Sequence, residues 1–126
     1  MRPRTMAEVA RLVGSGEPFD SCMANFLDEF YASPDAMAFE EEPPLLGPTM
    51  GEPGRLRDAF LAAAAEELAR AYDFSLPRWV AGEERELHCP WFASPLAALR
   101  AVLILESPPA FRARNLFVSE NALARA

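Results

Sequence analysis

The sequence predicts an all-α fold: a single compact domain of about five to six helices, with one long proline-rich connection and one aromatic loop. Helix start signals recur along the chain, and apolar residues repeat every three to four positions. The length of 126 residues suits one domain, residues 1–126. A hydrophobic fraction of 51% with 25% charged residues is typical of a globular fold rather than a disordered chain.

Two helices are expected near the N-terminus. Thr5 and Glu8 form a capping box and Gly14 is a suitable stop, which predicts a helix over residues 6–13. Asp20 is expected to cap a second, amphipathic helix. Its apolar stripe consists of Met23, Phe26, Leu27, Phe30 and Tyr31. We interpret this stripe as core-facing, and docking of a partner is the alternative.

A short helix and a long connection follow. Ser33 and Pro34 predict a helix start, with the helix running to about Glu40. Residues 41–54 contain four prolines and three glycines, so regular structure is not expected there. Apolar residues within this connection indicate that it packs across the surface, and both a functional loop and a packed crossover remain open.

The longest helix is predicted over residues 56–72, where apolar residues repeat every four positions. The alanines of residues 62–65 should let another helix approach closely. Residues 74–94 lack helical periodicity and are expected to form an extended aromatic loop, with a short strand at residues 79–80. Its large aromatic residues, interpreted as lids over the core or as anchors for a partner, are Trp79, Trp91 and Phe92.

The C-terminal part is expected to hold three short helical segments. Ser94 and Pro95 start an apolar helix over residues 96–106, which is too short to cross a bilayer and is therefore predicted to be a core helix. A shorter helix after Pro108 should carry Phe111, and Ser119 is expected to cap a last helical turn.

The net charge of −7 is distributed unevenly. Residues 1–54 hold three Arg and ten acids, whereas residues 55–126 hold nine of each, so all of the net charge lies in the first part. Such a surface repels phosphate, so direct nucleic-acid binding is not expected. The acids either form a solvated surface or meet a basic partner, and Glu40, Glu41 and Glu42 are the candidate contacts.

No residue pattern indicates an enzyme. His88 and Cys89 are adjacent, and Cys22 lies far from them, which does not match the ligand spacing of a zinc site or a cysteine paired with a base. No phosphate-binding loop or nucleophile elbow is present, so no cofactor or metal is expected. Two distant cysteines and no export signal predict reduced thiols and a cytoplasmic protein.

A polar cluster near the C-terminus consists of Arg112, Arg114 and Asn115. Arginine suits bidentate recognition of a carboxylate, so these residues are candidate partner contacts. A structural ion pair within the chain is the favoured alternative for the two arginines.

The C-terminal tail, FRxRNxFVSxNALxRA from Phe111 to Ala126, resembles that of a little-characterised family of small bacterial proteins. Members are typically encoded beside a nucleotidyltransferase-fold protein, in pairs that look like toxin–antitoxin modules. The resemblance implies an antitoxin-like or accessory protein that binds and neutralises this neighbour. The alternative is a regulatory, transcription-associated module that forms a homodimer.

Overall fold

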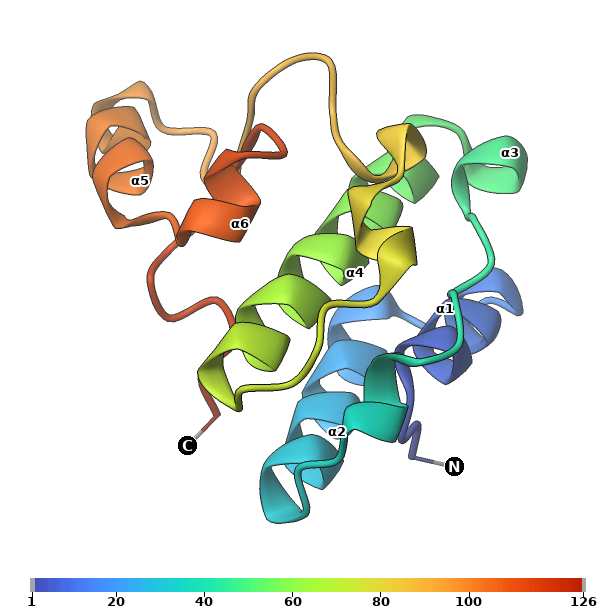
Figure 1. Cartoon of the computed structure of the whole chain (residues 1–126). Helices are drawn as coiled ribbons and strands as arrows, with labels where there is room; N and C mark the ends of the chain where they lie inside the picture. The colour runs from blue at the N-terminus through green and yellow to red at the C-terminus, as the bar shows by residue number, and fades with distance from the viewer. Residues whose placement is uncertain (1, 126) are drawn as a thin grey trace.

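The computed structural model describes residues 2–125 and shows a predominantly α-helical fold (Figure 1). The α-helices are α1 (Met6–Gly14), α2 (Phe19–Ala32), α3 (Gly47–Met50), α4 (Glu52–Ala71), α5 (Arg100–Glu106) and α6 (Pro109–Arg112). Short 3-10 helices are η1 (Ala36–Phe39), η2 (Arg78–Ala81), η3 (Glu83–Arg85) and η4 (Ala97–Leu99), and the two strands are β1 (Trp91–Phe92) and β2 (Leu116–Phe117).

The first two helices form largely as the sequence predicts. The Thr5 hydroxyl accepts a hydrogen bond from the Glu8 N–H at the start of α1. The Glu8 carboxylate in turn accepts from the Arg4 N–H and the Thr5 hydroxyl. Helix α2 begins one residue before Asp20, so Pro18 occupies the N-cap position expected for Asp20. Asp20 lies in the first turn, where a carboxylate interacts favourably with the helix dipole.

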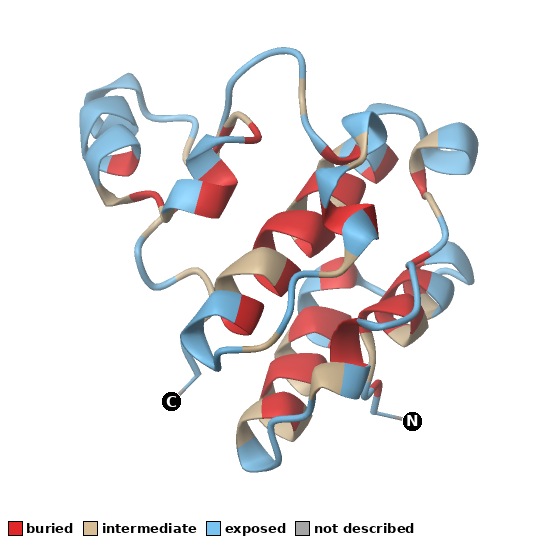
Figure 2. Ribbon diagram, in the orientation of Figure 1, coloured by how far each residue is buried: buried red, intermediate tan, exposed pale blue. Residues whose placement is uncertain are grey.

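The core lies along α4, which runs through the middle of the molecule with buried residues over most of its length (Figure 2). All four alanines of residues 62–65 are fully buried, so neighbouring segments cover this part of the helix. The Phe60 ring makes near-perpendicular contacts with Phe19 of α2 and Phe111 of α6, with ring centroids 5.3 and 5.1 Å apart. Helix α4 therefore joins the N-terminal helices to the C-terminal part of the chain.

The connection over residues 41–54 is more regular than expected. It contains α3, and α4 begins at Glu52 rather than at Leu56. Pro53 fits because the first turn of a helix does not need its N–H. The buried Asp58 carboxylate accepts hydrogen bonds from the N–H groups of Leu46 and Gly47, at 2.8 and 2.9 Å. A long-range contact from α4 therefore fixes the segment, and the segment is a packed crossover.

Two expectations on the aromatic loop, residues 74–94, need correction. Trp79 lies in η2 rather than in a strand, and its indole N–H donates to the Phe39 carbonyl at 2.8 Å. The strand is β1, which pairs in parallel with β2, so that Trp91 lies opposite Leu116. Sequence spacing did not reveal this strand because its partner lies more than twenty residues further along the chain.

The tail after α6 packs along the helices. Val118 is buried, the Tyr31 hydroxyl donates to the Leu123 carbonyl at 2.7 Å, and Arg125 pairs with Asp28 at 2.9 Å. The Ser119 hydroxyl accepts a hydrogen bond from the Asn121 N–H at 3.1 Å, as expected of a cap, but residues 120–123 form turns rather than the expected helical turn. Within residues 2–125, no helix has the length and apolar character needed to cross a membrane.

Candidate protein-binding surface

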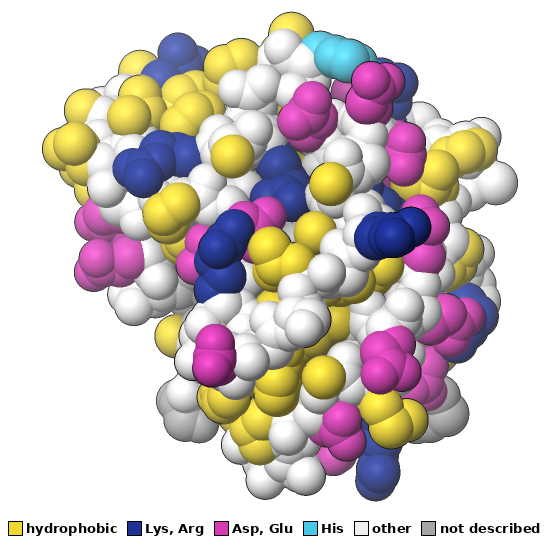
Figure 3. Space-filling model, in the orientation of Figure 1, with side chains coloured by type: hydrophobic (Ala, Val, Ile, Leu, Met, Phe, Trp, Pro, Cys, Tyr) yellow, Lys and Arg dark blue, Asp and Glu magenta, His cyan; other side chains and the backbone are white. Residues whose placement is uncertain are grey.

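Helix α5 is an exposed helix, which corrects the prediction of a core helix over residues 96–106. Among these residues, Leu103 alone is buried. Five large apolar side chains form what we call the α5 surface: Leu96, Leu99, Val102, Ile104 and Leu105. The most exposed are Leu105 at 80% and Leu96 at 61%. Figure 3 shows hydrophobic side chains gathered over this part of the molecule, at its upper left.

The end of α5 is attached firmly to the domain, although its side chains are exposed. The buried Ser107 hydroxyl follows the helix and donates to the Leu116 carbonyl at 2.9 Å. The same oxygen accepts from the Val118 N–H at 3.3 Å. A helix that is apolar on nearly every side normally lies in a protein interior or an interface. Here the domain presents such a helix to solvent, and large exposed apolar patches mark interaction sites.

Positive charge borders the α5 surface. The Arg100 guanidinium lies over the Phe92 ring, 5.2 Å from its centroid, and the Phe92 ring stacks on that of Phe117. Arg112 is exposed, and its guanidinium lies 3.5 Å from the Ile104 carbonyl. The nearby acid, Glu106, is half-buried. A complementary surface would therefore be apolar at its centre and would carry carboxylates at its margin.

The acidic candidates are partly neutralised within the chain. Glu41 pairs with Arg11 at 2.7 Å, and Glu42 pairs with the buried Arg85 at 3.3 Å. A hydrogen bond from Arg11 lowers the pKa of Glu41, although burial opposes it. Glu40 is exposed and forms no ion pair with another residue of the described range, 2–125. Two of the three glutamates are therefore paired with arginines, and the segment presents less negative charge than its sequence suggests.

The three aromatic candidates are not brought together as one anchor. Trp79 is only 8% exposed, and the Arg85 guanidinium packs over its ring, 5.0 Å from the centroid, so it is a lid over the core. Trp91 is 36% exposed and Phe92 is half-buried. Because consecutive strand residues point to opposite faces, the side chains of Trp91 and Phe92 lie on different surfaces of the molecule.

The expected polar cluster is mainly structural. Arg114 is 7% exposed and donates hydrogen bonds to the carbonyls of Ala110 and Val80 and to the Glu66 carboxylate, each at 2.8 Å. Burial raises the pKa of Glu66, but hydrogen bonds from Arg114 and Arg70 lower it more, so the pKa lies below its ordinary value. The favoured alternative, an internal ion pair, is confirmed for Arg114, which is not an exposed contact.

Asn115 also has a structural role. It adopts a left-handed conformation, with φ of 63°, which asparagine tolerates better than most residues. Its side-chain amide donates to the Leu87 carbonyl at 2.7 Å. Arg112 remains the exposed member of the expected cluster. Much of the tail motif therefore has a folding explanation.

The cysteine and histidine side chains do not form a recognisable chemical site. Both cysteines are free thiols: Cys22 is buried, which raises its pKa, and Cys89 is exposed beside the exposed His88. Over residues 2–125, no group of three or more His, Cys, Asp or Glu side chains is placed to hold a metal ion.

Sequence reasoning missed the α5 surface, although a signal was present. The run from Leu96 to Leu105 carries one charged residue, Arg100, and has no polar face. A helix with no polar face is expected to be covered by protein on all sides. A domain of this size cannot cover a helix in this way at its edge. No protein-family model, curated protein or solved structure that was compared matches this chain.

Proposed function

We propose that this protein acts by binding another protein, and that the α5 surface carries the contact. The observation behind this proposal is a helix that is apolar on nearly every side, attached to the domain and open to solvent. Full burial of one such side chain contributes roughly 1.5–3 kcal/mol. Covering several of them at once supplies enough free energy to stabilise a specific complex, after the cost of association is subtracted.

The charges beside α5 favour a different protein over a second copy of this chain. In a symmetric dimer the same patch meets itself, so the interface would gather Arg100 and Arg112 of both copies against one half-buried acid from each, Glu106. Like charges brought together at an interface weaken association. The partner is therefore a protein with an apolar patch bordered by carboxylates.

The resemblance of the tail supports a specific partner. It is a nucleotidyltransferase-fold protein encoded beside this one, and this chain acts as its antitoxin-like or accessory protein by steric cover of a functional surface. The acidic segment around Glu40 has a secondary role, because two of its three carboxylates are already paired with arginines. Changing Glu40, Glu41 and Glu42 to Ala should then alter affinity at low salt only modestly.

The test is growth of cells that express the adjacent open reading frame, with and without this protein, followed by co-purification through a tag on this chain. Rescue of growth together with a stable complex is expected. Leu105→Asp should abolish both, whereas Met37→Asp should not, because Met37 is 62% exposed on η1, outside the α5 surface.

Each result of this test would identify a different error in the proposal. If the unchanged chain gives no rescue and forms no complex, the antitoxin proposal is excluded. A complex that Leu105→Asp leaves intact would move the contact away from α5. A dimer of this chain alone, dissociated by Leu105→Asp in sedimentation analysis, would instead support the regulatory dimerisation module.

A further inference from the structure

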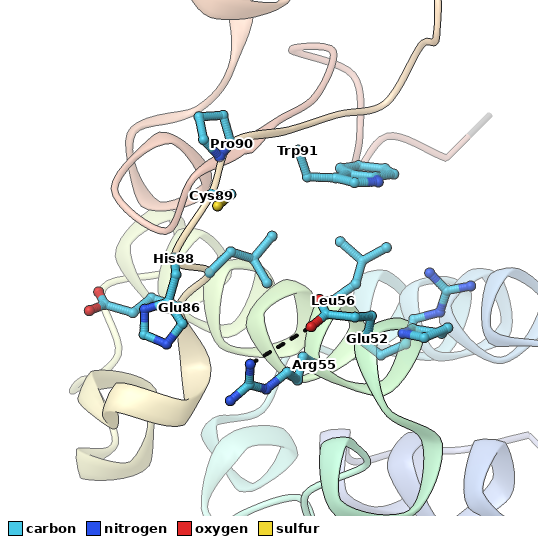
Figure 4. Close-up of a pocket in the computed structure, with 11 residues that line it drawn as sticks. Glu52, Arg55, Leu56, Glu86, His88, Cys89, Pro90 and Trp91 are labelled. Carbon is cyan, nitrogen blue, oxygen red and sulfur yellow. Dashed lines mark ion pairs between the residues drawn. The ribbon is translucent and has the colours of Figure 1, made fainter.

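A pocket of about 490 Å³ lies between the first turns of α4 and the segment that leads into β1 (Figure 4). Its volume falls within the range of small-molecule sites in proteins. Trp91, which lines it, and Phe92, which borders the α5 surface, point to opposite faces of β1. The pocket is therefore separate from the proposed protein contact.

The wall of the pocket is fixed in place by the residues after α6. The Leu87 N–H donates to the Arg114 carbonyl at 3.1 Å, and the Trp91 N–H donates to the Asn115 carbonyl at 2.8 Å. The Asn115 side chain adds its bond to the Leu87 carbonyl at 2.7 Å. Both ends of residues 88–90 are thus held, so the pocket is formed before any ligand arrives.

The pocket has an apolar end and a polar end. Leu56 and the indole of Trp91 lie near one another at one end, whereas Arg55 extends toward the side of His88 and Glu86 (Figure 4). Trp91 is 36% exposed, which leaves part of its indole accessible.

The two arginines that line the pocket, Arg55 and Arg57, have N–H groups available to a ligand. The nearest Arg55 nitrogen lies 3.9 Å from the Glu52 carboxylate, and both side chains are exposed, so this ion pair is weak. Arg57 also lines the pocket; its guanidinium lies 4.8 Å from the centroid of the Phe19 ring, and no carboxylate in the described range, 2–125, pairs with it. Arginine presents a planar set of N–H donors that matches a carboxylate.

We propose that this pocket binds a small planar aromatic carboxylate. The ring packs against Trp91 and Leu56, and the carboxylate accepts hydrogen bonds from Arg55. Aromatic packing and a charge-assisted hydrogen bond reinforce one another in such a site. A neutral aromatic molecule of the same shape packs against Trp91 and Leu56 but lacks the charge-assisted hydrogen bond from Arg55.

The indole N–H signals of the two tryptophans give a direct test by nuclear magnetic resonance. The probe is 2-naphthoate, titrated into the full-length protein, and Trp91→Phe assigns the signals. The Trp91 signal should shift with a dissociation constant on the order of 1 mM or below, as expected for a ligand of this size. The Trp79 signal should stay in place, because this indole is buried and donates to the Phe39 carbonyl.

Two comparisons test the role of the charge. The neutral amide 2-naphthamide should bind about tenfold more weakly than the carboxylate, and Arg55→Gln should weaken naphthoate binding by about the same factor. Arg78→Gln is the matched control, because Arg78 is exposed and lies outside the pocket. An unmoved Trp91 signal at saturating probe, or equal affinity of carboxylate and amide, would overturn the proposal.

Discussion

Replacing Arg114 by Leu tests whether the tail is held by its buried arginine. The guanidinium donates to two carbonyls and to the Glu66 carboxylate, each at 2.8 Å. A hydrogen bond between a charged donor and a buried carbonyl contributes about 1.5 kcal/mol, so two contribute about 3 kcal/mol. Glu66 keeps its bond from Arg70, so loss of the third contact adds only about 1 kcal/mol.

The expected loss is therefore about 4 kcal/mol, a large part of the roughly 5–15 kcal/mol that stabilises a typical domain. Urea unfolding followed by circular dichroism measures it, and the midpoint should fall by about 2 M for a slope near 2 kcal/mol/M. Arg78→Gln is the control, because this exposed side chain should change stability by less than about 0.5 kcal/mol. A loss below about 1 kcal/mol for Arg114→Leu would refute a structural role and return Arg114 to the candidate contacts.

Three further predictions concern packing, pH and the α5 surface. Gly54→Ala should destabilise the fold by more than about 1 kcal/mol, because a Cβ there would clash with the backbone oxygen of Leu46. Gly14→Ala, with an ordinary contact at 3.7 Å, should be close to neutral, and thermal unfolding compares the two variants. The folded pKa of Glu66 lies below its ordinary value of 4.5, so its contribution to stability is present above about pH 4.5 and is lost as the pH falls through the folded pKa. Glu66→Gln should therefore flatten the fall in unfolding free energy at acid pH, and an unchanged slope in acid titrations would argue against this pair. Leu105→Asp should change the free energy of unfolding by no more than about 0.5 kcal/mol, like Met37→Asp, because both side chains are exposed; a large loss in urea unfolding would show that α5 supports the core.

Local signals in the sequence predicted the helices well. The hydroxyl cap at Thr5 and the apolar stripe of α2 act within a few residues, so their effects are visible in the chain itself. These features place most of the core without any tertiary information.

The candidate site was predicted much less well. Trp79 and Arg114 are buried, in agreement with the core-lid and internal ion-pair alternatives rather than with partner contacts, and Glu41 and Glu42 are paired with arginines. Their partners lie tens of residues away along the chain, where no spacing rule reaches. The exposed α5 surface was missed for the same reason, since an apolar run does not state whether the domain covers it.

The sequence by itself determined the helical class, the cap at the start of the first helix and the acidic balance of the N-terminal part, because propensity, capping and charge are properties of neighbouring residues. The tertiary structure alone decided that Asp58 orders the proline-rich crossover, that Asn115 holds the wall of a pocket and that α5 faces solvent. Burial and ion pairing depend on which distant residues meet, and that is settled only when the whole chain has packed around α4.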